Sequence, residues 1–300
     1  MKDMQTGVSY ILTRDLSQAR QDLVEITTCS NFVVHTFSET DFYYHRQNMR
    51  EIIKLSRQQG LSVYLDPWGV GGVFGGETFS LFVAENPDAC LKRKGKIIPI
   101  ADISSKKFRK FMKEWLAAAL AMEPDVIFWD EPHQAGMNYK REEIKKIIDF
   151  LAEMTAIVSQ YGVKNAVCVY PQKDKLALNL WENILSLKTI DIFGTDPYWL
   201  FWNKKLDFVE EFAKKVYNLC KEYDKEPQLW IQAFKIPQGQ EQEISRAVEI
   251  VSAAGIKNIA SWSYDSGSLV DHLNSANPEL VWQTLKQAYN KVRENDIVIR

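Results

Sequence analysis

Short apolar runs alternate with longer amphipathic stretches along the whole chain. The apolar runs are five or six residues long and are bounded by turn-forming residues, which predicts β-strands. The amphipathic stretches repeat apolar residues at three- and four-residue spacing, which predicts helices with one buried face. The expected strands are Val8–Thr13, Phe32–Phe37, Leu61–Asp66, Val126–Glu131, Ala166–Tyr170, Ile192–Asp196, Leu229–Phe234 and Ile259–Tyr264. The expected helices are Ser17–Thr28, His45–Gln59, Lys106–Met122, Arg141–Tyr161, Lys173–Leu187, Leu206–Tyr223, Glu241–Ala254 and Pro278–Arg293.

This strict alternation of strand and helix determines the expected fold class, α/β. A strand followed by a helix and then another strand implies a parallel sheet, and eight such units favour a closed (β/α)8 TIM barrel. The alternative is an open, dinucleotide-binding sheet, which would show Gly-x-Gly-x-x-Gly after its first strand; the chain has Thr13, Arg14, Asp15 and Leu16 there. No linker rich in Pro, Gly or Ser divides the chain, so residues 1–300 are expected to form a single barrel domain.

The connection after the third expected strand is unusually long, at about forty residues. We expect a Gly-rich loop that folds over a cleft as a lid, because its first part contains Gly69, Gly71, Gly72, Gly75 and Gly76. The alternative interpretation of these glycines is a loop that binds phosphate. It is less favoured because no Gly-Lys-Ser/Thr ending is present and no helix follows the glycines directly.

The composition limits the class of protein but does not indicate a particular function. Apolar residues make up 46% of the chain and charged residues 25%, with a net charge of -2, which is typical of a globular protein and excludes a disordered or fibrous one. The densest basic run, Lys92 to Lys94 with Lys96, is too short for a nucleic-acid footprint, so no nucleic-acid partner is expected. The four cysteines stand far apart, which favours reduced thiols over zinc ligands or disulfides.

The ends of the chain and its hydropathy bear on localisation. The first residues lack the apolar stretch of a secretory signal, and no segment approaches the roughly 18 uninterrupted apolar residues of a spanning helix. We therefore expect a cytoplasmic protein with no membrane partner. The oligomeric state is left open.

Polar side chains gather where the expected strands end. In barrel enzymes the chemistry is built at the carboxyl ends of the strands. Three strands stop at an acid followed by proline, which holds the acid in an extended conformation and aims it toward the mouth of the barrel. A single acid of this kind often just caps a turn, but several close together repel each other and indicate a site. The strand-end acids are Asp66, Asp130, Glu131, Asp196 and Asp265.

Aromatic side chains fall in apparent loops beside these acids. Trp68, Tyr198, Trp199, Phe201 and Trp202 all lie outside the expected strand interiors. Large rings in the core would be the ordinary explanation for aromatic residues. Their loop positions favour a ligand platform instead.

Paired carboxylates among exposed rings suit cleavage of a glycosidic bond, which needs one acid to protonate the leaving oxygen and another to attack the anomeric carbon or activate water. The chain resembles the barrel-type glycoside hydrolases in Glu131-Pro132, a carboxylic acid/base followed by proline at the end of strand four. In the largest group of these enzymes a glutamate nucleophile closes strand seven, where this chain has Gln232. Others, including α-galactosidase-like enzymes, place their acids at strands four and six, which matches Glu131 or Asp130 with Asp196. The resemblance implies a glycosidase (O-glycosyl hydrolase) with a carbohydrate substrate.

These considerations assign roles to individual residues. Glu131 is the expected general acid, because Trp129 and Pro132 could supply apolar surroundings that raise a carboxyl pKa. Asp196 is the expected nucleophile or base, with Asp265 in reserve. Asp130 and Glu131 should point to opposite faces, because side chains alternate along a strand. No cofactor or metal is expected. The expected substrate-binding residues are Asp66, Trp68, Asp130, His133, Tyr198, Trp199, Trp202, Gln232 and Tyr264.

Other functions remain open on the sequence. A metal-dependent barrel hydrolase or isomerase could use the strand-end acids with His133, although the chain has only four histidines. A phosphosugar enzyme is less favoured, because the turns after strands seven and eight show no convincing amide nest. A non-catalytic carbohydrate-binding barrel, in which Gln232 marks a lost nucleophile, belongs to a different class of function.

Overall fold

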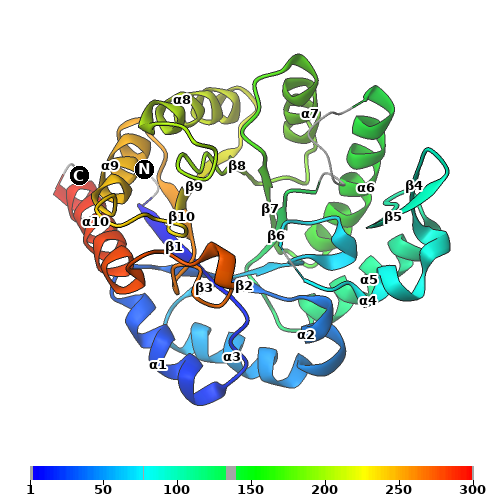
Figure 1. Ribbon diagram of the computed structural model, residues 1–300, viewed down its shortest axis with the longest axis horizontal. Helices are drawn as coiled ribbons and strands as arrows, with labels where there is room; N and C mark the ends of the chain where they lie inside the picture. Colours follow the sequence, from blue (N-terminus) through cyan, green and yellow to red (C-terminus); the bar gives the residue numbers. More distant parts are fainter. Residues whose placement is uncertain (1–2, 77, 133–139, 299–300) are drawn as a thin grey trace. The chain divides into compact units, whose positions relative to one another are not determined.

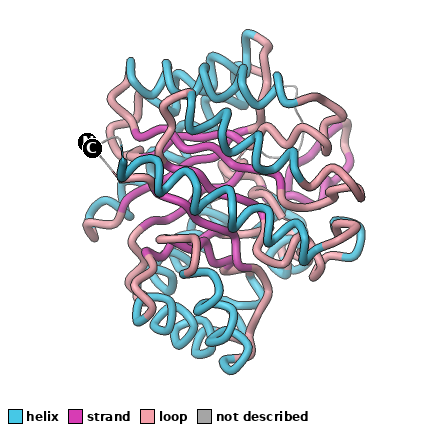
Figure 2. The backbone as a smooth tube through the Cα atoms, turned by 90° about the vertical axis from the view of Figure 1, so that its left-hand side faces the viewer, coloured by secondary structure: helices cyan, strands magenta, loops and turns pink. Residues whose placement is uncertain are grey.

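The computed structural model describes residues 3–76, 78–132 and 140–298. Eight parallel strands close into a barrel in the order β1, β10, β9, β8, β7, β6, β3, β2, and helices alternate with them along the chain (Figures 1 and 2). The predicted (β/α)8 barrel is therefore confirmed. The barrel strands are β1 (Gln5–Tyr10), β2 (Phe32–Thr36), β3 (Ser62–Asp66), β6 (Val126–Asp130), β7 (Lys164–Val169), β8 (Ile192–Thr195), β9 (Glu226–Gln232) and β10 (Asn258–Trp262).

The main helices lie within about two residues of the predicted amphipathic stretches, except that the last one continues to Val298, five residues past its predicted end. The eight main ones are α1 (Leu16–Thr27), α3 (Arg46–Gln58), α5 (Lys106–Leu120), α6 (Arg141–Gln160), α7 (Lys175–Leu185), α8 (Leu206–Glu222), α9 (Gln242–Ala253) and α10 (Pro278–Val298). Among the described residues, no helix combines the length and the apolar character needed to cross a membrane.

Contacts divide the chain into two compact units. The first unit consists of residues 1–35, 51–63 and 192–300. In it Val8 pairs with both Val33 and Ser261, and Gly194 pairs with Gln228, so its strands are in parallel register. The prediction of one domain over residues 1–300 stays a prediction.

Polar residues explain why β9 starts three residues before the predicted strand. The Gln228 side chain donates to Asn258 Oδ1 at 2.8 Å, and Asn258 Nδ2 donates to Glu226 Oε1 at 2.9 Å. These partners satisfy polar groups that would otherwise be costly to bury. A search for apolar runs therefore misses this end of the strand.

The second unit consists of residues 36–50 and 64–191. Its strands pair Leu65 with Ile127 and Phe128 with Ala166, again in parallel. The rings of Phe108 on α5 and Phe150 on α6 stack with centroids 6.1 Å apart in its core.

The connection after β3 is largely ordered secondary structure and not an open loop. It contains a 3-10 turn (Val70–Gly72), α4 (Leu81–Glu85), a second 3-10 turn (Pro87–Ala89) and an antiparallel hairpin of β4 (Cys90–Arg93) and β5 (Lys96–Ala101). The hairpin turns at Lys94 and Gly95, whose φ angles of 50° and 75° fit the left-handed pair that a tight two-residue turn requires.

A short helix that the sequence analysis missed holds this connection in place. Helix α2 (Glu39–Tyr44) carries Glu39, which is 2% exposed. Its carboxylate accepts from Gly71 N at 2.8 Å, Ser80 Oγ at 2.6 Å and Phe82 N at 2.7 Å. Glu39 thus ties the Gly-rich segment at Gly71, and the start of α4 at Ser80 and Phe82, to α2.

Candidate active site

Three carboxyl groups meet in the second unit, where two parallel strands end. Asp66 is the last residue of β3, Asp130 is the last residue of β6, and Glu131 follows it. A Cβ atom built on Gly75 would lie 2.2 Å from Asp130 Oδ2 and 3.2 Å from Glu131 Oε2. Because both oxygens surround the same point, the two carboxyl groups are neighbours, and only a glycine fits against them.

The expected opposite orientation of Asp130 and Glu131 is wrong. Glu131 has φ of 43°, in the left-handed region that side-chain-bearing residues seldom adopt. This conformation interrupts the alternation of the strand and brings Glu131 to the same side as Asp130. The Glu131 N–H donates to the Cys168 carbonyl at 3.0 Å, which fixes the turn against β7. Such rare backbone conformations cluster at functional sites.

Burial and mutual repulsion keep protons on this cluster. Asp66 is 4% exposed, and within the described part of the chain its Oδ1 has no hydrogen-bond partner. Burial, together with the charges of Asp130 and Glu131, raises the pKa of Asp66 well above its usual range. Burial and the charge of Glu131 likewise raise the pKa of Asp130. The cluster therefore retains protons at pH values where isolated carboxylic acids are ionised.

The Gly-rich segment packs directly beside these acids. Gly75 N donates to the Asp130 carbonyl at 3.1 Å, and Gly69 N donates to the Gly75 carbonyl at 2.7 Å. A Cβ atom on Gly76 would lie 2.3 Å from the indole nitrogen of Trp68, which is 3% exposed. Trp68 is thus buried beneath the segment, and the segment packs closely against one side of the site.

The first unit carries the other strand-end acid and the amide. Asp196 follows β8 and is 5% exposed. Gln232, the last residue of β9, is fully buried. Its Oε1 accepts from Leu200 N at 3.0 Å and from Phe201 N at 3.1 Å, and its Nε2 donates to the Phe234 carbonyl at 2.9 Å. Gln232 therefore holds the loop after β8 in position.

Aromatic rings form a cluster at the same strand ends. Tyr198 and Trp262 each pack edge-on against Phe234, with centroids 5.0 Å and 4.9 Å away. Phe201 packs on Trp202 at 5.5 Å and is 47% exposed. Phe234 and Trp262 are not among the residues expected at the site, although both lie at the ends of predicted strands, where barrel enzymes place their functional groups.

The remaining candidates occupy different surroundings. Trp199 is 1% exposed and donates to Glu243 on α9 at 2.7 Å, so its ring is directed into the protein. Asp265 accepts from Leu269 N at 3.0 Å and from the Ser263 hydroxyl, and so caps its own turn. The Tyr264 hydroxyl donates to Asp22 at 3.3 Å. His133 lies outside the described residues.

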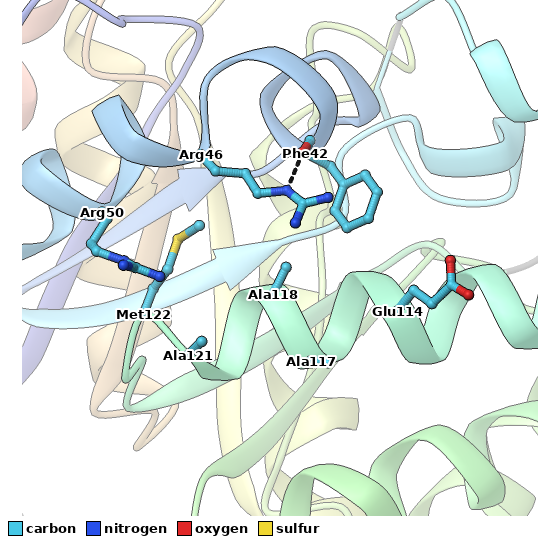
Figure 3. A pocket seen from close by; sticks show the side chains of 8 residues that line it. All are labelled: Phe42, Arg46, Arg50, Glu114, Ala117, Ala118, Ala121 and Met122. Atoms are coloured by element: carbon cyan, nitrogen blue, oxygen red, sulfur yellow. Dashed lines mark hydrogen bonds between the residues drawn. The ribbon is translucent and has the colours of Figure 1, made fainter.

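A groove of about 510 Å³ lies away from the strand ends, between α3 and α5 (Figure 3). Arg46 and Arg50 line one side, and Ala117, Ala118 and Ala121 lie opposite them on α5. No strand-end acid belongs to its lining, so the groove is separate from the candidate active site. Within residues 3–76, 78–132 and 140–298, no group of three or more His, Cys, Asp or Glu is placed to hold a metal ion.

Comparison with known proteins places the chain by its fold. No protein-family model and no curated protein sequence matches it. It is a (β/α)8-barrel protein similar to many solved structures. An endo-1,4-beta-mannanase from Rhizomucor miehei has a TM-score of 0.69 at 12% identity, covering 97% of this chain and 95% of that one. A GH5_18 protein from Streptomyces cattleya in complex with GlcNAc has a TM-score of 0.68 at 13% identity, covering 97% and 81%.

Proteins with this fold that are similar to the chain also include an enzyme of a different class. A D-psicose 3-epimerase with D-fructose present has a TM-score of 0.58 at 8% identity, covering 97% of this chain and 99% of that one. Identities this low establish the shared barrel, and the reaction has to be argued from the site.

Proposed function

We propose that the chain is a glycoside hydrolase that uses carboxyl groups at the carboxyl ends of its barrel strands. The observation that carries the proposal is the cluster of the buried Asp66 with the partly exposed Asp130 and Glu131, in which the pKa values of Asp66 and Asp130 are raised. A cluster that keeps a proton above the pH range in which isolated carboxylic acids ionise can donate one to a leaving oxygen, which an ionised carboxylate cannot do.

Glu131 acts as the general acid in this proposal. It gives its proton to the glycosidic oxygen as the bond to the anomeric carbon breaks, so the leaving sugar departs as a neutral alcohol. Asp130 and Asp66 restrain how readily the proton is released, because each further negative charge in the cluster is costly. Their role is to tune Glu131 and to accept hydroxyl hydrogen bonds.

Asp196 is the proposed second carboxylate. It either removes a proton from the attacking water, or it attacks the anomeric carbon and forms a glycosyl ester, which water deprotonated by Glu131 then hydrolyses to release the sugar and free Asp196. The aromatic cluster of Tyr198, Trp202, Phe234 and Trp262 supplies flat apolar surfaces for sugar C–H groups. The carbohydrate-active barrels among the structural neighbours support a sugar as substrate, on the strength of fold alone.

The dependence on the leaving group tests the role of Glu131. We expect Glu131→Gln to lose about 10²–10⁴-fold in turnover of oligosaccharides and alkyl glycosides, whose leaving oxygen needs a proton. The same variant should keep most of its kcat/KM on 2,4-dinitrophenyl glycosides, because their leaving group departs without a proton and kcat/KM reports the step in which it departs. Asp149→Asn, which alters an exposed carboxylate on α6, is the matched control.

Two outcomes would contradict the proposal. Equal losses on both kinds of leaving group would remove Glu131 as proton donor. Turnover that a chelator abolishes and a divalent metal restores would indicate the metal-dependent class instead.

A further inference from the structure

A small cavity of about 270 Å³ lies in the first unit, where β1 and β10 end. Its lining shares no residue with the carboxyl cluster of Asp66, Asp130 and Glu131. Ligand pockets commonly measure about 300–1,000 Å³, so this one matches a single small ring. Its polar lining comes from the end of β1, from α1 and from the segment after β10, and includes Tyr10, Thr13, Gln18, Asp22, Tyr264 and Asp265.

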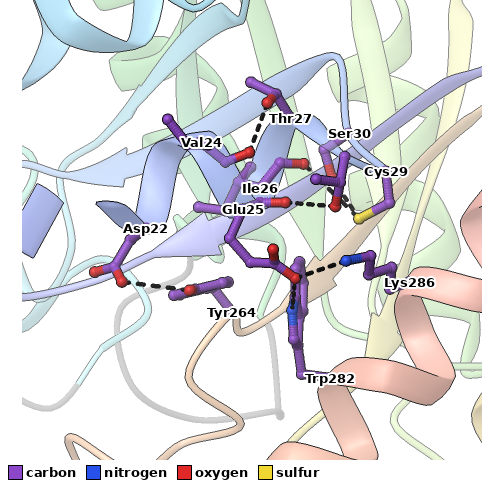
Figure 4. Close-up of polar contacts among 11 residues, drawn as sticks. Asp22, Val24, Glu25, Ile26, Thr27, Cys29, Ser30, Tyr264, Trp282 and Lys286 are labelled. Atoms are coloured by element: carbon purple, nitrogen blue, oxygen red, sulfur yellow. Dashed lines mark hydrogen bonds and ion pairs between the residues drawn. The ribbon is translucent and has the colours of Figure 1, made fainter. Parts of the chain in front are cut away.

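The hydrogen-bond donors of this pocket are directed at Asp22. Tyr10 donates its hydroxyl hydrogen to Asp22 Oδ2 at 2.6 Å. Gln18 Nε2 donates to Asp22 Oδ1 at 2.8 Å, and the Tyr264 hydroxyl donates to the same oxygen at 3.3 Å (Figure 4 shows the Tyr264 contact). Because a hydroxyl has one hydrogen, neither tyrosine has a donor left for a ligand.

The other side chains of the lining follow the same pattern. Thr13 donates its hydroxyl hydrogen to the Ile11 carbonyl at 3.3 Å, and Ser268 donates to Asp265 Oδ2 at 3.4 Å. Gln18 keeps a second amide N–H, and the other side chains of the lining offer mainly the lone pairs of hydroxyl and carboxylate oxygens. The pocket is therefore rich in acceptors and poor in free donors.

The charges of the lining also favour an occupant that donates hydrogen bonds. Among the described residues, Asp22 and Asp265 are the charged members of the lining, and no lysine or arginine belongs to it. Burial, with the hydrogen bond and charge of Asp22, raises the pKa of Tyr10, and burial with the charge of Asp22 raises that of Tyr264. Both phenols therefore stay as neutral hydroxyls. An occupant has to donate hydrogen bonds and must not be an anion.

We propose that this pocket is a binding site for one pyranose ring that is neutral or carries an ammonium group, with amino sugars preferred. The choice of a sugar rests on the proposed glycosidase function; the requirement for a donor without negative charge rests on the pocket alone. Sugar hydroxyls and a protonated amine supply the donors that the lining lacks, and the rings of Tyr10 and Tyr264 give apolar contact. Uronates and sugar phosphates are excluded by Asp22 and Asp265.

Binding of monosaccharides to the full chain tests this site without any turnover. Saturation-transfer NMR and calorimetry should show glucosamine binding more tightly than glucose, with glucuronate not binding. Asp22→Asn should weaken glucosamine binding at least about tenfold, since it removes the charge. Asp149→Asn should leave it unchanged.

A second variant separates loss of the site from loss of fold. Leu269, which is 50% exposed, lines the cavity without taking part through its side chain in the polar contacts, so Leu269→Trp should fill the pocket and abolish binding at unchanged Tm. Glucuronate binding as tightly as glucosamine, no sugar binding to the unmodified chain at millimolar concentration, or unchanged binding in both Asp22→Asn and Leu269→Trp would each overturn the inference. None of these results bears on Glu131, whose test is turnover.

Discussion

The positions of Asp66, Asp130 and Glu131 at the strand ends explain the raised pKa values of the first two and the close approach of the third. Two of them end buried strands, and the third follows in a left-handed backbone conformation that turns it toward its neighbour. The sequence predicted that acids would gather at the strand ends. It could not predict the orientation of Glu131, because a positive φ at a glutamate leaves no pattern in the residues around it.

Removing the charge of Asp66 should stabilise the fold in a pH-dependent way. Its pKa is raised in the folded state, so ionisation favours the unfolded chain, and the folded protein loses stability as pH rises from the unfolded value near 3.8 toward the folded value. Asp66→Asn lacks this loss. We expect the Tm of Asp66→Asn to exceed that of the unmodified protein least at pH 4, and the difference to grow by about 2–4 °C by pH 8. A Tm change of this size corresponds to roughly 1 kcal/mol in the free energy of unfolding for a chain of this length.

Thermal melts across this pH range, with Asp149→Asn as control, measure the effect. An advantage that is constant with pH, or that shrinks as pH rises, would show that Asp66 is not an acid of raised pKa.

Among the elements, those with strong apolar patterns were predicted well and those shaped by polar contacts were not. Strand β3 and helix α6 lie within about one residue of expectation. The early start of β9 depends on the bonded side chains of Gln228 and Asn258. The connection after β3 was expected as a lid, but the buried carboxylate of Glu39 anchors it, and that contact joins residues distant in sequence.

The fit of this connection against the acids predicts an effect of Gly75→Ala. The added methyl group would meet Asp130 Oδ2 at 2.2 Å and displace the carboxyl pair. We expect kcat to fall about 10–100-fold, because small misplacements of catalytic groups are costly. Gly239→Ala, at an open position with φ of 84°, is the control and should lower stability without lowering kcat. Unchanged kcat in Gly75→Ala would separate this segment from the chemistry.

The loop after β8 should depend on Gln232 for its stability. Gln232→Leu removes the acceptor of two backbone N–H groups and the donor to a carbonyl. Leaving such groups unpaired costs about 2–4 kcal/mol in the free energy of unfolding, which urea titration measures. Stability within about 0.5 kcal/mol of the unmodified protein would mean that the loop does not need this amide.

At the scale of the molecule, counting strand and helix units was enough to predict the barrel. Eight alternating units have few ways to bury both faces of a parallel sheet, so the fold follows from the pattern. Function does not follow in the same way, because solved barrels similar to this one include an epimerase as well as a mannanase. The proposed reaction therefore rests on the carboxyl cluster.

Thiol accessibility tests the packing of the whole molecule. All four cysteines are free and buried. We expect an aromatic disulfide reagent to modify less than one thiol per native chain and all four in guanidinium, with no change of Tm on adding a reductant. Rapid modification of several thiols in the native protein would contradict the described packing.

The central claim is that this barrel cleaves glycosidic bonds through its carboxyl cluster, and the most direct test is hydrolysis of a panel of α- and β-linked oligosaccharides. The account predicts turnover of at least one of them, insensitive to chelator, reduced about 10²–10⁴-fold in Glu131→Gln and unchanged in Asp149→Asn. Turnover that survives intact in Glu131→Gln, or the absence of turnover on any oligosaccharide that the protein binds, would contradict it and leave a carbohydrate-binding barrel.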